Sequence, residues 1–85
     1  MDNREQLQKI RNKIQRASMG YQAQVWDNGM FEIHNVKESD YNYIVSQLRR
    51  IEEVISVDNT YRYDFSKPTF GVATKIYTIR GSYKI

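Results

Sequence analysis

The sequence contains few of the residues that support covalent cross-links, metal sites or catalysis. Its 85 residues include no cysteine, one histidine, one proline and four glycines. Without cysteine there are no disulfides and no thiolate metal site, which excludes small disulfide frameworks and zinc fingers. No apolar run approaches the roughly 18 residues of a membrane span, and the charged N-terminus lacks the apolar stretch of a signal peptide. We therefore expect a cytoplasmic protein that does not enter a membrane.

Acid–base and nucleophilic chemistry also lack the residues they need. His34 is the only histidine, so a Ser-His-Asp arrangement or a histidine metal site has no second candidate. Glu52 and Glu53 are neighbours in a predicted helix and diverge by about 100°. Asp58 and Asp64 are separated by most of a predicted strand, and the glycines fit no phosphate-binding loop. The sequence predicts a protein that is not an enzyme, with no catalytic residue, no metal and no cofactor.

Positive charge is concentrated at the two ends of the sequence. The formal net charge is +3, from 13 Lys and Arg against 10 Asp and Glu. Residues 1–18 and residues 55–85 each carry five basic and two acidic groups, whereas residues 19–54 are net negative. Such clustering favours an anionic partner.

Two helices are predicted within a single domain that spans residues 1–85. Residues 3–18 carry one apolar stripe at helical spacing, and Gly20 suits the left-handed position after a helix. The stripe consists of Leu7, Ile10, Ile14 and Ala17. Residues 37–54 predict a second helix with Ser39 as its N-cap. Its apolar face consists of Tyr41, Ile44, Val45, Leu48 and Ile51.

A hairpin is predicted between the two helices, around Asn28-Gly29. A two-residue loop would mix polar and apolar side chains on both faces of the hairpin. A three-residue loop that starts one residue earlier pairs Val25 with Phe31 and makes one face apolar throughout. We favour the three-residue loop, which places Trp26 beside Met30 on the solvent side.

Two further strands are predicted after the second helix. Residues 55–65 alternate in polarity as a half-buried strand does, and residues 70–80 are rich in Val, Thr, Ile and Tyr. Residues 66–69 are expected to form the loop between them. The alternative is a tight turn at residues 58–60 that splits the first of these strands.

The four-residue loop also predicts which side chains face the core. It sets Tyr63 opposite Val72 on the core side and turns Arg62, Lys75 and Tyr77 outward. The element order is α-β-β-α-β-β, which predicts an α+β fold of two layers. We expect a four-stranded antiparallel sheet with both helices on one face and solvent on the other.

Aromatic residues make up 13% of the sequence and include seven tyrosines. The aromatic residues expected in the core are Phe31, Tyr61, Tyr63, Phe65 and Phe70. The residues expected on the open sheet face are Trp26, Met30, Arg62, Lys75 and Tyr77. A second candidate surface is a basic strip on the first helix, which consists of Lys9, Lys13 and Arg16.

The predicted open face fits two functions. Aromatic side chains stack on bases and Lys and Arg contact phosphates, so nucleic-acid binding is slightly favoured. The alternative is a protein-directed regulator or inhibitor, of the kind that phages and mobile elements encode as accessory proteins. Such a protein would act through Trp26, Met30, Tyr77 and the exposed sheet edge, or as a homodimer. Trp26 and Met30 beside Arg62 and Lys75 would favour nucleic acid, whereas an apolar patch apart from them would favour a protein partner.

Overall fold

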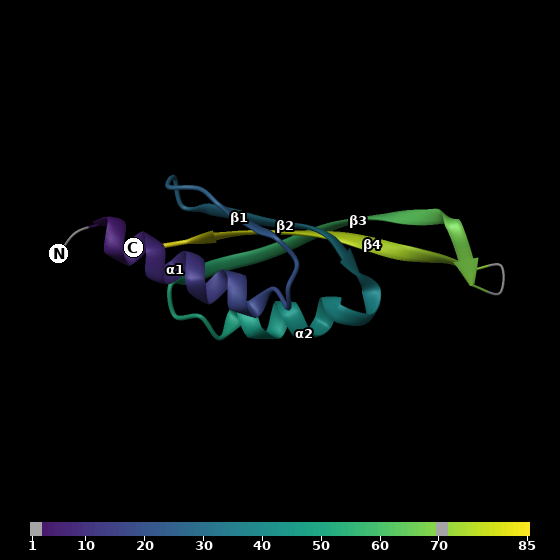
Figure 1. The fold of residues 1–85 in the computed structure, drawn as a ribbon, viewed down its shortest axis with the longest axis horizontal. Coiled ribbons are helices and arrows are strands. Elements are labelled where there is room, and N and C mark those ends of the chain that lie inside the picture. The colour runs from purple at the N-terminus through teal and green to yellow at the C-terminus, as the bar shows by residue number, and fades with distance from the viewer. Residues whose placement is uncertain (1–2, 70–71) are drawn as a thin grey trace.

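The protein folds as two helices packed on one face of a four-stranded antiparallel sheet (Figure 1). The computed structural model describes residues 3–69 and 72–85, and the side chains of residues 3–65 and 73–85. The elements in chain order are α1 (Asn3–Ala17), β1 (Ala23–Val25), β2 (Met30–Lys37), α2 (Glu38–Arg49), β3 (Val54–Thr69) and β4 (Val72–Tyr83). The strands lie in the order β1-β2-β4-β3. The predicted α+β fold is confirmed.

The core lies between the two helices and about half of the sheet. The largest fully buried apolar side chains are Ile10, Ile14, Phe31, Ile33, Val36, Ile44, Leu48 and Ile79. The helical members of this set belong to the two predicted apolar faces, which are therefore confirmed. The predicted N-cap of α2 is wrong, because Lys37 occupies that position and Ser39 lies within the first turn.

The β1–β2 hairpin has the predicted register, in which Val25 pairs with Phe31. Gly29 has a φ of +92°, the left-handed conformation that the three-residue loop requires. The loop is closed by a hydrogen bond from the Trp26 backbone N–H to the Met30 carbonyl at 2.9 Å. Trp26 and Met30 are therefore neighbours, and both are exposed, as predicted.

A β-bulge near the end of β2 changes which side chains of that strand face the core. The register between β2 and β4 shifts by one residue between Ile33 and Val36, and Asn35 has a φ of 59°. The extra residue breaks the two-residue alternation of the strand. Val36 consequently faces the helices, where it is fully buried and pairs with Tyr77 of β4.

The predicted register of the β3–β4 hairpin is wrong by three residues. Tyr63 pairs with Lys75 and Tyr61 pairs with Tyr77, whereas the sequence prediction set Tyr63 against Val72. The reason is that β3 continues as one strand to Thr69, through the residues predicted to form a loop. The prediction of one unbroken strand in place of two is confirmed.

A register that differs by an odd number of residues places every side chain of β4 on the face opposite to the predicted one. Lys75 and Tyr77 therefore lie on the helix side, and their predicted position on the open face is corrected. Arg62 lies on the open face as predicted, where one guanidinium nitrogen donates to the Asn35 side chain at 3.1 Å.

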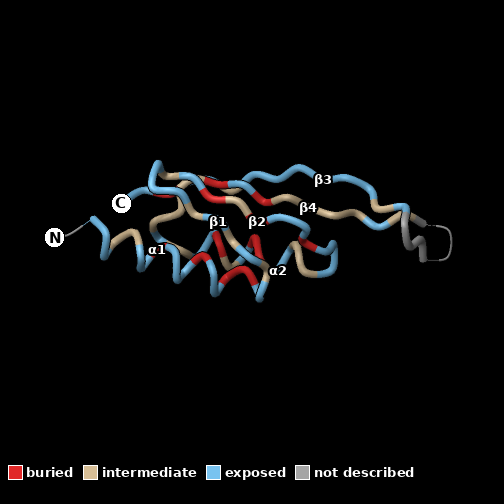
Figure 2. Tube along the Cα trace, turned by 45° about the horizontal axis from the view of Figure 1, so that its top comes forward, coloured by how far each residue is buried: buried red, intermediate tan, exposed pale blue. Residues whose placement is uncertain are grey.

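The far part of the β3–β4 hairpin extends beyond the helices as an arm, defined here as residues 61–69 and 72–75. A 12-residue α2 covers about 18 Å, whereas a 16-residue β3 extends about 53 Å. Figure 2 shows that buried residues are absent from the described part of the arm. The prediction that Tyr61, Tyr63 and Phe65 are core residues is wrong, because no helix lies over them. Phe70 lies outside the described residues.

Gly81 provides the space that the Phe31 ring occupies. The two residues pair across β2 and β4, and a Cβ added at Gly81 would lie under 3.0 Å from the ring and from the Ser56 carbonyl. The Phe31 ring is held in the core, and the Ser56 carbonyl belongs to the backbone of the paired strand β3. The Phe31 ring is fully buried in this arrangement.

We expect Gly81→Ala to lower the free energy of unfolding by about 3 kcal/mol, because the added methyl overpacks the core. Gly20→Ala is the matched control, since a Cβ added at Gly20 would meet no described atom within 4 Å, and only the φ of +89° is unfavourable for alanine. Its expected cost is about 1 kcal/mol. Urea unfolding of both variants measures the difference, and equal losses would contradict the placement of Phe31 over Gly81.

Candidate functional site

The residues predicted to form one open-face site lie in separate parts of the molecule. Trp26 and Met30 lie on the open face at the β1–β2 loop. Arg62 lies on the same face, roughly 20 Å along the sheet, given the six residues of β4 that separate the pairing partners of Met30 and Arg62. Lys75 lies on the other face. The predicted basic and aromatic open face is therefore not formed.

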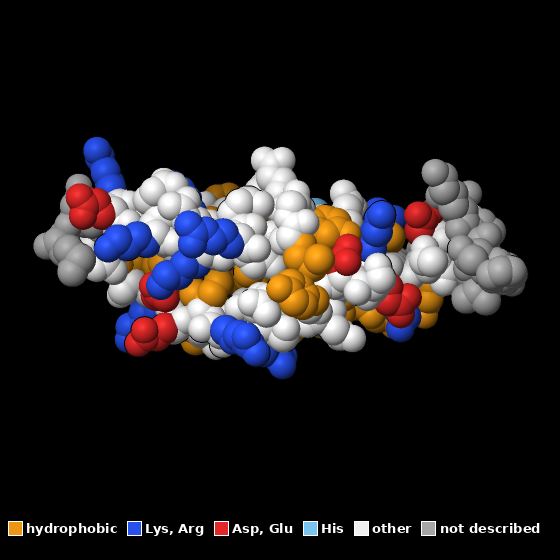
Figure 3. Space-filling view, turned by 60° about the horizontal axis from the view of Figure 1, so that its bottom comes forward, with side chains coloured by type: hydrophobic (Ala, Val, Ile, Leu, Met, Phe, Trp, Pro, Cys, Tyr) orange, Lys and Arg blue, Asp and Glu red, His pale blue; other side chains and the backbone are white. Residues whose placement is uncertain are grey.

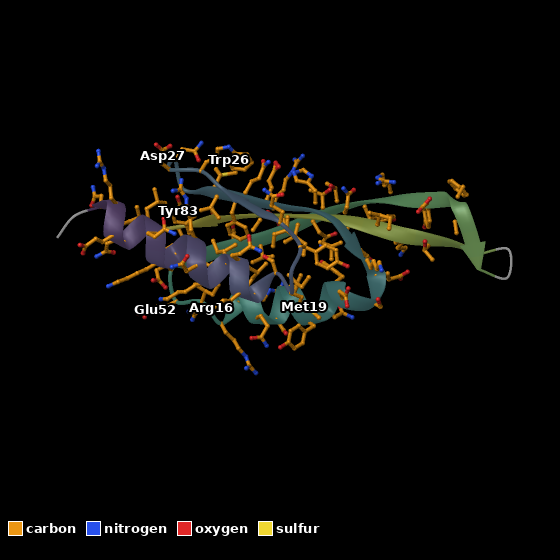
Figure 4. The ribbon with its side chains drawn as sticks, in the orientation of Figure 1. Arg16, Met19, Trp26, Asp27, Glu52 and Tyr83 are labelled. Carbon is orange, nitrogen blue, oxygen red and sulfur yellow. The ribbon has the colours of Figure 1, made fainter. Side chains whose placement is uncertain are left out.

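The Trp26–Met30 patch is exposed, and hydrogen bonds from Tyr83 hold its backbone against the end of β4. The side chains are 41% and 43% exposed. The buried Tyr83 donates its hydroxyl hydrogen bond to the Trp26 carbonyl, and the Tyr83 backbone N–H donates to the Gly29 carbonyl at 2.8 Å. Figure 4 shows Trp26 on the opposite side of the sheet from Arg16, so this patch and the basic strip of α1 cannot contact one flat partner together.

Tyr77 is part of the packing between β4 and α2. Its ring stacks on Tyr41 with centroids 4.0 Å apart and an interplanar angle of 3°. Burial raises the pKa of Tyr41 above its ordinary value, and the neighbouring Tyr77 adds to the shift. Asn59 of β3 donates a hydrogen bond to the Tyr41 hydroxyl. Tyr77 therefore connects the sheet to α2 and marks the inner end of the arm.

An exposed row of three aromatic side chains continues outward from Tyr77 on the helix side of β3. The aromatic row consists of Tyr61, Tyr63 and Phe65, which are 53%, 47% and 74% exposed. The ring centroids of Tyr61 and Tyr63 are 5.7 Å apart, and those of Tyr63 and Phe65 are 6.1 Å apart. These three residues are predicted from the sequence to be core residues, although the unequal lengths of helix and strand are a signal that could have revealed their exposure.

Lys75 supplies positive charge at the aromatic row. Its ammonium lies 4.8 Å from the centroid of the Tyr61 ring, within the range of a cation–π interaction. In the register of the hairpin, Lys75 is also directly opposite Tyr63. Stacking surfaces and a cation therefore occur together on the arm, on the face opposite to the one predicted.

The basic strip on α1 is partly neutralised by acidic residues. The Lys13 ammonium donates to both carboxylate oxygens of Glu53, at 3.0 and 2.8 Å. These hydrogen bonds hold the pKa of Glu53 below its ordinary value of 4.5. Arg16 lines a groove of about 480 Å³ that also contains Arg50 and Glu52. Figure 3 shows basic side chains with acidic ones among them at this end of the molecule.

The described residues offer little support for metal binding, for histidine chemistry or for a membrane span. Within residues 3–69 and 72–85, no group of three His, Asp or Glu side chains lies close enough together to hold a metal ion. His34 is exposed and lies 3.2 Å from the Glu32 carboxylate on the open face. In the same part of the chain, no helix is long and apolar enough to cross a membrane.

We expect Tyr77→Ala to lower the free energy of unfolding by about 2–3 kcal/mol, since it removes the ring that packs on Tyr41. Tyr77→Phe retains that ring and should cost less than about 1 kcal/mol. Chemical denaturation of the two variants measures both values. A Tyr77→Ala variant as stable as the wild type would show that Tyr77 is not a packing residue.

The ion pair between Lys13 and Glu53 predicts a small dependence of stability on pH. Because the pKa of Glu53 is lowered in the folded state, the stabilisation is fully present above pH 4.5 and is lost as the pH falls through the lowered value. Lys13→Gln should cost about 0.5 kcal/mol at pH 7 and close to nothing at the acid end. Lys9→Gln, one turn away on α1, should show no such pH dependence. A Lys13→Gln effect that persists after Glu53 is protonated would contradict the assignment.

No protein-family model, curated protein or solved structure matches this chain. A function is therefore inferred from the exposure, spacing and charge of the chain's own side chains.

Proposed function

We propose that this protein is a non-enzymatic module that binds single-stranded nucleic acid along the helix-side face of its arm. The observation that carries the proposal is the exposed aromatic row, next to a lysine and beyond the end of the helix layer. Successive bases stack on rows of exposed aromatic side chains in many single-strand binders, and each stack contributes about 1–3 kcal/mol.

The arm offers both kinds of contact that such binding needs. Tyr61, Tyr63 and Phe65 present ring surface at intervals of about 6 Å, a spacing that adjacent unstacked nucleotides can match. Lys75, held over the Tyr61 ring, is within reach of a phosphate beside the stacked base. The net charge of +3 and the exposed Lys9 and Arg16 on α1 add a weak long-range attraction for a polyanion.

A protein partner at the Trp26–Met30 patch is the second candidate function. The observation that favours it is the distance of this patch from both Arg62 and Lys75. The cations closer to it are already engaged, because Arg11 donates to the Val25 carbonyl and Arg80 pairs with Glu32. An exposed apolar pair of this kind suits a protein surface better than a phosphate backbone. Under this alternative the protein acts as a regulator or inhibitor, and the aromatic row has no part in binding nucleic acid.

Titration with fluorescently labelled single-stranded oligonucleotides tests the nucleic-acid proposal. We expect Tyr63→Ser and Phe65→Ser each to weaken binding about tenfold, because each removes one stacking surface. Trp26→Ser is the matched control, since Trp26 is similarly exposed but lies on the opposite face, and it should bind as the wild type does. Binding should also weaken as salt increases.

The single tryptophan provides an independent readout of the same experiment. If the oligonucleotide occupies the arm, the fluorescence of Trp26 stays unchanged at saturation. Quenching of Trp26 fluorescence would show that the nucleic acid binds the open face, near Trp26, and not the helix side of the arm. Absence of binding at roughly 50 mM salt, where electrostatic attraction is strong, would overturn the proposal and leave the protein-directed function.

A further inference from the structure

The outer edge of β3 is a long and regular strand edge. β3 is the last strand of the sheet, so its second edge has no pairing partner among residues 3–69 and 72–85 of the single chain. Its register with β4 is continuous from Ser56 to Asp64, and the side chains of residues 58–63 are all exposed. Proteins usually protect such edges with bulges, prolines or charges. Here the irregularities lie at the two ends, between Val54 and Ser56 and between Asp64 and Thr69, which leaves the middle of the edge open.

We propose that this edge binds a second copy of the chain in antiparallel orientation, with a two-fold axis through Thr60. The two sheets would then form one continuous sheet of eight strands. The partner is inferred from the edge itself, because a two-fold pairing requires a sequence that is complementary to its own reverse. This inference is independent of the proposed nucleic-acid site.

Backbone geometry restricts where the axis can lie. The N–H and C=O groups of an edge strand point outward at every second residue. Hydrogen bonds across an antiparallel pair need outward-pointing residues opposite one another. The axis of a symmetric pair therefore passes through a residue and not between two residues, and each candidate register is defined by its central residue.

Charge selects the register centred on Thr60. In that register Asp58 of each copy lies opposite Arg62 of the other, so that two ion pairs form across the seam. Both side chains are exposed, and both belong to the open face. Arg62 donates to Asn35 through one of its guanidinium nitrogens, which leaves its other N–H groups for a carboxylate.

Nearby registers are less favourable. An axis through Asp58 or Arg62 places like charges opposite each other, and an axis through Tyr61 places Asp58 opposite Asp64. An axis through Tyr63 does pair Arg62 with Asp64, but it centres the seam close to the irregular part of β3 between Asp64 and Thr69. The Thr60 register instead keeps both ion pairs within the regular part of the strand, from Ser56 to Asp64.

The pairing is compatible with the aromatic row as a binding surface. A two-fold axis perpendicular to the sheet keeps the helix side of one copy continuous with the helix side of the other. Tyr61 and Tyr63 would lie opposite Asn59 and Val57 of the second copy, on the same face as before. The dimer therefore combines two aromatic rows on one surface.

Light scattering of the purified full chain, without nucleic acid, tests the proposal first. We expect a mass of two chains, and Arg62→Asp should raise the dimer dissociation constant roughly tenfold or more, because two ion pairs become two repulsions. Arg62→Lys should retain the dimer. Adding Asp58→Arg to Arg62→Asp reverses both charges and should restore dimerisation. Circular dichroism of each variant verifies that the chain remains folded.

Cysteine cross-linking then tests the register. Because the chain has no cysteine, Thr60→Cys introduces one thiol per copy, which lies on the axis and should form a covalent dimer under mild oxidation. Tyr63→Cys tests the competing axis and should cross-link much more slowly. Gln24→Cys is the control on the opposite edge strand, since Gln24 is also exposed and also lies on the open face.

Three other results would each overturn the inference. A wild-type chain that is monomeric at its highest soluble concentration has no such interface. A dimer that cross-links through Gln24→Cys or Tyr63→Cys faster than through Thr60→Cys uses another edge or register. A monomer that instead accepts a strand of a different protein at β3 would show that the edge has another occupant.

Discussion

A helix gains only about 1.5 Å per residue, whereas a strand gains about 3.3 Å, and this difference governs the architecture of the protein. The 12 residues of α2 cannot cover the 16 residues of β3. The sheet therefore has a covered half, which holds the core, and an uncovered half, which extends the molecule to 54 Å in length against 20 and 19 Å in its other dimensions. The Tyr41–Tyr77 stack lies at the border between the two halves.

The same constraint explains how one strand contributes both to the core and to an exposed aromatic surface. Toward its start, β3 places Val57 against the core that the helices cover. Farther along, the same helix-side positions hold Tyr61 and Tyr63, which have no helix above them. Tyrosine suits this transition because its ring packs on a neighbour while its hydroxyl stays hydrated. The arm thus presents ring surface on a backbone that its pairing with β4 holds in place.

The sequence predicted those parts of the fold in which local patterns agree with one another. The β1–β2 register followed from Gly29 in the turn together with the alternation of both strands, and the buried faces of both helices followed from their periodicity. The β3–β4 register could not be obtained in this way, because apolar residues of β4 occupy both faces, as Ile76 and Tyr77 illustrate. Residues 66–69 also have the composition of a loop, although they continue the strand. The register error affects only the candidate site residues of β4. Arg62, which lies on β3, is predicted on the correct face, whereas Lys75 and Tyr77, which lie on β4, are predicted on the wrong face.

The register of the β3–β4 hairpin decides which side chains share a face with Lys75. Nuclear Overhauser effects between backbone protons of paired residues measure it directly in solution. Cross-strand signals are expected between Tyr61 and Tyr77 and between Tyr63 and Lys75. Signals between Tyr63 and Val72 would instead establish the register with the four-residue loop. That result would place Tyr77 and Lys75 on the open face, and it would contradict the arrangement in which Lys75 lies beside the aromatic row.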